Sequence, residues 1–278
     1  MKSDLELIND KNFWVRLNVA KRISIEHLPR MMNDKNWEVR YEVARRIAVE
    51  HLPKMMNDEN SNVRWEVAAR VGREGGAFAN EHLPMMMNDE SYSVRWEVAK
   101  RIGSEGGAFA IEHLPKMMND NHSHVRLKVA ERIADEGGAF ASEHLPKMMN
   151  DNHSHVRREV AKRIGIEHLP KMMNDESYNV RYEVAKRIGS EGGAFADEHL
   201  PKMMNDENYY VRWEVAERID PKHLPKMMND ESWEVRWEVA KRIASEGGVF
   251  ADEHLPKMMN DESSYIRSEV AKRMKELK

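Results

Sequence analysis

The chain repeats one pattern of apolar and polar positions. Val94, Val98 and Ile102 recur every four residues, and at ~100° per residue they share one side of a helical wheel. Tyr92 and Trp96 fall on the other side of the same wheel. The pattern therefore predicts an amphipathic helix that buries its Val and Ile face.

Copies of this helix run from one end of the chain to the other. Each copy starts at an Asp that is followed six residues later by an Arg, and successive copies lie 24 or 31 residues apart. A period of this length indicates a solenoid. Upstream of most Asp residues, Glu-His-Leu-Pro-Lys-Met-Met-Asn predicts a first helix that begins near the proline. We expect an all-α solenoid of ten repeats, forming one domain over residues 1–278; the aligned Asp residues are Asp10, Asp34, Asp58, Asp89, Asp120, Asp151, Asp175, Asp206, Asp230 and Asp261.

The ends of the second helices carry capping signals. Ser or Asn stands at the N-cap position of most repeats, as at Ser91 and Asn36, and His122 and His153 replace it in two. Glycines just past the last apolar residue predict left-handed C-caps at Gly72, Gly103, Gly165 and Gly189. The 31-residue repeats add a Glu-Gly-Gly-Ala-Phe-Ala segment (Val replaces Ala once), which we expect to lengthen the helix before the proline and to bury its Phe.

These residues resemble a known family. A short helix that ends in Asp, a turn and then Val-Arg-x-x-Val-Ala-x-x-Ile is similar to HEAT-like repeats, especially the short bacterial form of phycobilin lyases. The 24-residue repeats resemble the leucine-rich repeat variant, in which one helix shrinks to about a turn. The resemblance implies a right-handed superhelix of helical hairpins, whose second helices line the concave surface and whose Asp and Arg residues form a ladder between neighbours. Independently, the wheel turns Arg95 toward the packed side, where its charge needs a partner.

Composition narrows the possible functions. The formal net charge is −4, which gives no overall attraction to nucleic acid or anionic lipid. The chain has no cysteine, and it has neither a leader-like segment nor a long apolar run, so we expect a cytoplasmic protein without membrane contact. Glu and Arg four residues apart, as in Glu97 and Arg101, predict ion pairs on an exposed helix face; the other pairs are Glu42/Arg46, Glu66/Arg70 and Glu183/Arg187.

Variation between the repeats is concentrated at three positions: the third and fourth after the Asp, and the first after the Arg. All seven Trp and all seven Tyr residues lie there, on the side opposite the predicted core. An exposed aromatic stripe is typical of a recognition surface. We therefore predict a groove that binds a protein or an extended peptide; its partner-binding residues are Trp14, Trp37, Tyr41, Trp65, Tyr92, Trp96, His124, His155, Arg158, Tyr178, Tyr182, Tyr209, Tyr210, Trp213, Trp233, Trp237 and Tyr265.

Two alternatives to protein recognition stay open. Stacking on aromatics beside a basic row suits nucleic acid or nucleotides; that row contains Lys21, Arg45, Lys100, Lys162, Lys186, Lys241 and Lys272 and is interrupted by Glu131 and Glu217. Alternatively, the aromatics only pack between repeats and stiffen the array.

Histidine raises the question of chemistry. The recurrent His-Leu-Pro segments follow the scaffold, which favours a structural role. His122, His124, His153 and His155 occur only in two adjacent repeats, where they form a metal site, an anion pocket or polar specificity determinants. No carboxylate or thiolate is patterned with them and no nucleophile motif is present, so we predict no cofactor, no catalytic residues and no enzyme activity.

Overall fold

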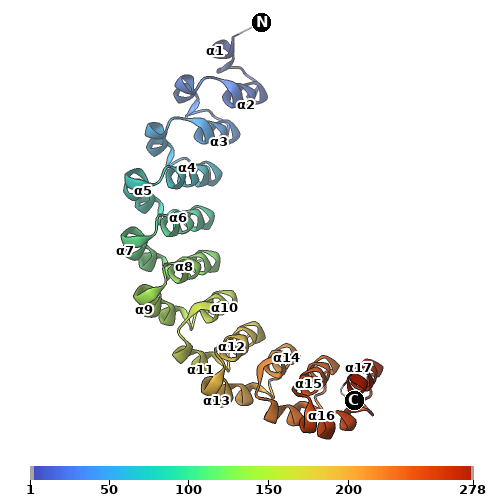
Figure 1. The fold of residues 1–278 in the computed structure, drawn as a ribbon. Coiled ribbons are helices and arrows are strands. Elements are labelled where there is room, and N and C mark those ends of the chain that lie inside the picture. The colour runs from blue at the N-terminus through green and yellow to red at the C-terminus, as the bar shows by residue number, and fades with distance from the viewer. Residues whose placement is uncertain (1–2, 277–278) are drawn as a thin grey trace. The chain divides into compact units, whose positions relative to one another are not determined.

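The computed structural model describes residues 3–276, which divide into two compact units, 1–148 and 149–278 (Figure 1). The predicted all-α solenoid fold is confirmed, and the described residues form no strand. The count of ten repeats and their union in one domain stay predictions.

Unit 1 alternates long helices with shorter segments. Its elements are α1 (Asp4–Leu7), α2 (Phe13–Arg22), η1 (Ile25–Met31), α3 (Trp37–Arg46), η2 (Val49–Met55), α4 (Ser61–Glu74), α5 (Gly76–His82), η3 (Leu83–Met86), α6 (Tyr92–Glu105), α7 (Gly107–Met117), α8 (Ser123–Glu136) and α9 (Gly138–Met148), where η marks a 3-10 helix.

Unit 2 repeats the same alternation. Its elements are α10 (Ser154–Arg163), η4 (Ile166–His168), α11 (Leu169–Met172), α12 (Tyr178–Glu191), α13 (Gly193–Met203), α14 (Tyr209–Arg218), η5 (Pro221–Met227), α15 (Trp233–Glu246), α16 (Gly248–His254), η6 (Leu255–Met258) and α17 (Ser264–Glu276).

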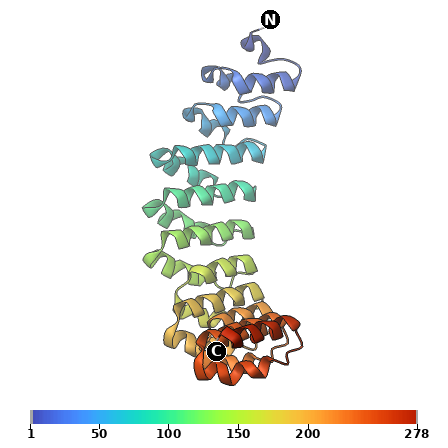
Figure 2. The same cartoon turned by 45° about the vertical axis from the view of Figure 1, so that its right-hand side comes forward.

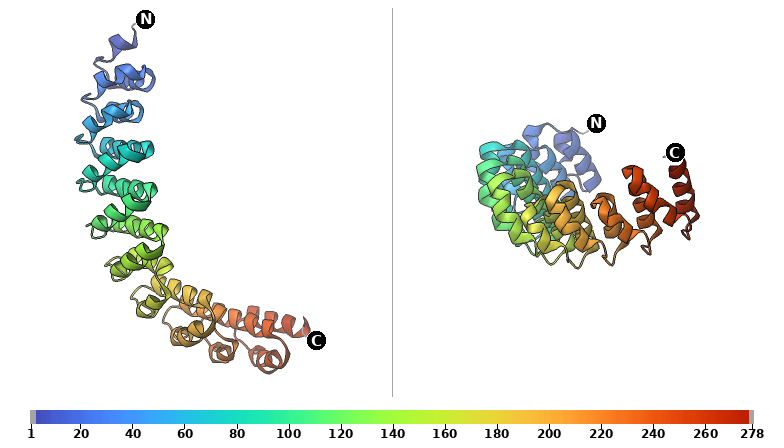
Figure 3. Two further views of the ribbon diagram at one scale, coloured as in Figure 1. Left: turned by 60° about the vertical axis from the view of Figure 1, so that its left-hand side comes forward. Right: turned by 60° about the horizontal axis from the view of Figure 1, so that its bottom comes forward.

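Each unit has two layers. The long helices that begin after each turn stack side by side in one layer, and the segments containing His-Leu-Pro form the other (Figures 2 and 3). The core lies between the layers. Val94, Val98 and Ile102 are fully buried there together with Leu114, as the apolar pattern predicts.

Repeat length decides how the layers are joined. In the 24-residue repeats the long helix ends directly before an Ile, as α2 ends at Arg22, and a short 3-10 segment usually follows. In the 31-residue repeats the long helix continues for another turn, as α4 does to Glu74, and the chain reverses at a glycine pair. Gly75 and Gly76 have φ values of 72° and 55°, a left-handed conformation that favours glycine.

Two sequence expectations about these junctions are wrong. Gly72, Gly103 and Gly189 lie inside α4, α6 and α12 without positive φ, and Gly165 has φ −56°, so none of the four is a left-handed C-cap. The added residues also lengthen both helices of the junction instead of only the one before the proline. Their Phe is half-buried; Phe78, for example, packs edge-on against His82 with ring centroids 4.3 Å apart.

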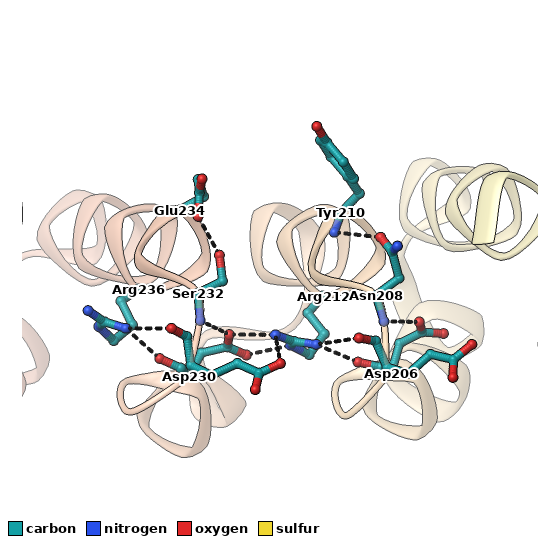
Figure 4. Close-up of polar contacts among 10 residues, drawn as sticks. Asp206, Asn208, Tyr210, Arg212, Asp230, Ser232, Glu234 and Arg236 are labelled. Carbon is teal, nitrogen blue, oxygen red and sulfur yellow. Dashed lines mark hydrogen bonds and ion pairs between the residues drawn. The ribbon is translucent and has the colours of Figure 1, made fainter.

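The predicted ladder between neighbouring repeats is confirmed within each unit. Arg95 Nε donates to Asp120 Oδ2 at 2.6 Å, and Arg95 Nη1 donates to the carbonyl oxygen of Asp89 at 2.7 Å. The Asp also accepts a backbone N–H two residues further on, as Asp120 does from His122. Figure 4 shows one such link in unit 2, between Arg212 and Asp230. The corresponding ion pairs are Arg16–Asp34, Arg40–Asp58, Arg64–Asp89, Arg157–Asp175, Arg181–Asp206, Arg212–Asp230 and Arg236–Asp261.

The N-cap prediction is confirmed for Asn and for two histidines. Asn36 accepts backbone N–H groups at the start of α3, and His122 and His153 accept one each through Nδ1, at 3.3 and 3.4 Å. Ser91 has the extended cap conformation, but its hydroxyl contacts Ser93 instead of the backbone. No helix within the described residues combines the length and apolar character needed to span a bilayer.

Candidate functional site

The predicted binding residues separate into an exposed rim and a half-buried floor. Rim residues come from the first turn of each long helix, where the side chain projects beyond the layer; they are Trp14, Trp37, Tyr92, His124, His155, Tyr178, Tyr210, Trp233 and Tyr265. Floor residues, apart from Tyr209, come directly after the ladder Arg, about one turn beyond the rim positions, and pack between adjacent long helices. They are Tyr41, Trp65, Trp96, Arg158, Tyr182, Tyr209, Trp213 and Trp237. The sequence pattern alone does not distinguish these two sets.

A groove of about 580 Å³ lies on the long-helix layer of unit 1. It brings together three of the predicted residues, Trp37, Tyr41 and Trp65, with Lys21 and Glu38. We call it the unit 1 groove; the rest of its lining is Leu17, Glu42, Asn62 and Ser93.

A second groove, of about 630 Å³, lies on the long-helix layer of unit 2. It brings together six of the predicted residues, and we call it the unit 2 groove; its lining is Arg158, Tyr178, Asn179, Tyr182, Tyr209, Tyr210, Trp213 and Glu234. Most of these are at the three variable positions, so repeat variation shapes the cavity. The predicted residues that line neither groove are Trp14, Tyr92, Trp96, His124, His155, Trp233, Trp237 and Tyr265.

Tyrosines dominate the unit 2 groove. The Tyr210 ring stacks on Tyr209 with centroids 4.1 Å apart and lies parallel to Tyr178 at 6.3 Å. Hydrogen bonding to Tyr210, followed by burial, raises the pKa of Tyr209 to about 12. Burial, followed by the Glu214 carboxylate, raises the pKa of Tyr182 to about 12. Both phenols therefore stay protonated near neutral pH and can donate hydrogen bonds.

A row of buried carboxylates runs beneath the aromatic floor, and sequence analysis missed it. Glu97 is fully buried and accepts from Arg101 at 2.6 Å and from Lys100 at 3.2 Å. The predicted exposure of the Glu and Arg pairs is therefore wrong, because the flank of each long helix is covered by its neighbour. The one available signal was the recurrence of Glu at this position; the buried members are Glu42, Glu66, Glu97, Glu159, Glu183, Glu214 and Glu238.

These carboxylates neutralise much of the predicted basic row. Lys162 lies 2.6 Å from Glu159, and Lys241 lies 3.1 Å from Glu238. Lys100 also sits 5.3 Å from the centroid of Trp96, as a cation over the ring. Charges that are held in this way are poorly placed to contact phosphate groups.

The four histidines outside the His-Leu-Pro segments form two pairs, one in each unit. His122 stacks on Tyr92 with centroids 3.8 Å apart and lies 5.1 Å from His124. Desolvation, followed by the charge of His124, lowers the pKa of His122. His153 and His155 lie 5.0 Å apart in unit 2. Over residues 3–276, no three His, Cys, Asp or Glu side chains are grouped to hold a metal ion.

Comparisons with known proteins identify the fold. No family model matches the chain, and no curated protein matches it. Among solved structures, a leucine-rich repeat variant with a repetitive structural motif is similar over 87% of this chain and 87% of its own, with 27% identity and a TM-score of 0.64. YibA of E. coli is 19% identical over 87% of this chain and 97% of its own, with a TM-score of 0.55. The predicted resemblance to HEAT-like repeats and the leucine-rich repeat variant is confirmed.

The prediction of no enzyme activity, which rested on missing motifs, is contradicted by the comparisons, which include two enzymes. The similar structures include human deoxyhypusine hydroxylase, at 17% identity, 82% and 95% coverage and a TM-score of 0.38. They also include the complex of CpcE and CpcF of phycocyanin lyase from Nostoc sp. PCC7120, at 14% identity, 84% and 95% coverage and a TM-score of 0.42.

Proposed function

We propose that this HEAT-like helical-repeat chain binds an extended segment of a protein or peptide along the aromatic side of its long helices. The observation that carries the proposal is the pair of grooves, both lined mainly by the positions at which the repeats differ. An otherwise uniform scaffold that varies on one side of its helices fits selective recognition.

Exposed aromatic rings provide the binding energy in this proposal. Tyr178, Tyr210 and Trp233 are 40%, 48% and 47% exposed, so a partner would remove much apolar surface from water by covering them. The half-buried floor residues Tyr182 and Trp213 are already held between helices, and they present a rigid surface at little further entropic cost. Asn179 and Arg158 supply polar contacts that select the partner's register.

Nucleic acid is the less supported partner. Base stacking needs free aromatic faces, which the rim offers, but phosphate binding also needs unpaired cations. Lys100, Lys162 and Lys241 are each paired with a buried Glu, and the net charge is −4.

The test compares a rim variant with a matched surface control. Random linear dodecapeptides displayed on phage are selected on the intact wild-type chain, and binding of the recovered peptides is measured by fluorescence anisotropy. The triple variant Tyr178→Ala, Tyr210→Ala, Trp233→Ala should weaken binding at least about tenfold. Val249→Ala, which changes an 84% exposed residue of α16 in the other layer, should leave binding unchanged.

Both chains should keep wild-type circular dichroism and melting, because the altered side chains are not part of the core. Failure to recover any peptide would overturn the proposal. Saturable, salt-sensitive quenching of tryptophan emission by a mixed-sequence single-stranded oligonucleotide, without peptide binding, would replace it with nucleic-acid recognition.

A further inference from the structure

The unit 2 groove has opposite charges at its two ends. Arg158 comes from α10, and Glu234 comes from the start of α15. Between them, α12 and α14 contribute four tyrosines and Trp213. Arg158 is the only basic residue among the ten aligned positions that follow a ladder Arg, so this charge departs from the repeat.

The guanidinium of Arg158 retains unused hydrogen-bonding capacity. Its side chain is 42% exposed and forms an ion pair with Glu183, whose Oε2 lies 3.8 Å from Nε. That distance exceeds a hydrogen bond, and Nε, which is buried, has no hydrogen-bond partner in the structure. Neither Nη group makes a hydrogen bond among the described residues, so the two groups can donate to a partner's carboxylate.

Glu234 carries the opposite, uncompensated charge. Its carboxylate accepts a hydrogen bond from Ser232 Oγ at 2.5 Å, and no cation among the described residues pairs with it. Figure 4 shows Glu234 and Tyr210 projecting to the same side of their helices, away from the Asp and Arg ladder. The buried carboxylates beneath the floor differ from Glu234 because they have cationic partners: Glu214 pairs with Arg218, and Glu238 pairs with Lys241.

The spacing of the helices sets the length of a segment that could reach both ends. From α10 to α15 there are three steps between adjacent long helices. At ~8–10 Å a step, the ends lie roughly 24–30 Å apart. An extended chain advances ~3.3 Å per residue, so about eight residues span the groove.

Resting on the function proposed above, we propose that the unit 2 groove binds a linear segment of about eight residues in a single direction. An acidic side chain at one end of the segment pairs with Arg158, and a basic side chain at the other end pairs with Glu234. Apolar or aromatic side chains between them pack on the tyrosines and Trp213. Reversing the segment would place like charges together at both ends, which is the repulsion that sets orientation.

The test is a charge swap in the intact chain. Dodecapeptide phage libraries are selected separately on wild type and on Arg158→Glu, Glu234→Arg, and the recovered peptides are sequenced. Wild type should enrich acidic and basic residues about eight positions apart in one order. The swapped chain should enrich the same spacing in the opposite order, and each pool should bind its own chain at least about tenfold better than the other.

Milder variants keep the test informative if the swapped chain melts early. Arg158→Leu and Glu234→Ser introduce the residues found at the equivalent positions of other repeats, Leu127 and Ser93. The first should abolish only the acidic enrichment and the second only the basic enrichment. Val249→Ala, in the other layer and outside both grooves, is the control and should change neither.

The two proposals fail in different ways. Peptides that lose affinity for the rim triple variant but show no charge order, or the same order on wild type and swapped chains, would overturn the directional groove and leave peptide binding in place. Recovery of no peptide would overturn both.

Discussion

The side chain of Arg70 caps the helix of the preceding repeat by donating from Nη1 to the carbonyl oxygen of Ala44 at 2.9 Å. Its Nη2 also donates to the carbonyl oxygen of Ile47 at 2.9 Å. Arg187 and Arg242 make the same pair of contacts to the helix before them. In all three cases the preceding repeat is a short one, whose helix ends with free carbonyl groups.

The equivalent arginine behaves differently after a long repeat. Because α4 continues for another turn, it leaves no free carbonyl at this level, and Arg101 donates to Glu97 of its own helix instead. Arg218 likewise pairs with Glu214 at 2.5 Å. Repeat length thus selects the partner of one recurrent arginine.

Removing such a cap should destabilise the chain. Arg70→Ala leaves two carbonyl groups without their donors, and we expect a loss of about 1–3 kcal/mol in the free energy of unfolding measured in urea. Arg22→Ala is the matched control, because Arg22 occupies the same position in the first repeat and only pairs with Asp4 at the surface. A loss as large in the control would show that the carbonyl contacts of Arg70 are unimportant.

Gly72 should resist replacement although it lies inside a helix. A Cβ at this position would lie 2.3 Å from Cγ of Arg101, so the side chain of the next repeat needs the space. We expect Gly72→Ala to destabilise by about 1–3 kcal/mol, despite a gain in helix propensity of about 1 kcal/mol. Thermal melts of Gly72→Ala in an Arg101→Gly background provide the check, because the Cβ of Arg101 would also lie only 2.6 Å away and must be removed. In that background the alanine should be neutral or stabilising.

The ladder should make stability depend on acid pH. Burial alone would raise the pKa of Asp120, but hydrogen bonds from Arg95 and from the backbone of His122 lower it overall. Because the pKa of Asp120 is lower in the folded state than in the unfolded state, its ionised carboxylate stabilises the fold. This stabilisation is fully present above the unfolded-state pKa of ~3.9 and is lost as the pH falls through the folded-state pKa.

Asp120→Asn is the corresponding test. At neutral pH the free energy of unfolding of this variant should be about 3 kcal/mol below that of wild type, because Arg95 keeps a buried charge without its counter-ion. The difference should shrink toward zero below about pH 4. A difference that persists unchanged in acid would contradict the ionic account, and Asp4→Asn serves as the surface control.

Tyr182 should ionise late. Burial, followed by Glu214, raises its pKa to about 12. The protonated phenol therefore contributes fully to stability below the ordinary tyrosine pKa of ~10, and this contribution is lost as the pH rises through 12. Phenolate absorbance after a rapid pH jump, read before the chain unfolds, should show one less late-titrating tyrosine in Tyr182→Phe. Glu214→Gln should move that tyrosine to lower pH, and an unchanged titration in both variants would contradict the assignment.

Much of this protein follows from its sequence alone. The spacing of Val94, Val98 and Ile102 determines which face of a helix is apolar, and the recurrence of Asp and Arg indicates a contact that every repeat makes with the next. Local chemistry also marks the N-caps at Asn36 and His122. Each of these features depends on a single helix or on a contact that recurs in every repeat. The sequence pattern therefore predicts them.

Tertiary structure decided the features on the flanks of the helices. A helical wheel assigns directions around one axis, but burial at the edge of its apolar face depends on how closely the next helix packs. For this reason Glu97 is buried although its pattern indicated surface, and Trp213 is half-buried whereas Tyr210 is exposed. Likewise, the partner of Arg70 depends on where the previous helix ends. Side-chain positions are periodic in the sequence, whereas their accessibility is set by neighbours 24 or 31 residues away.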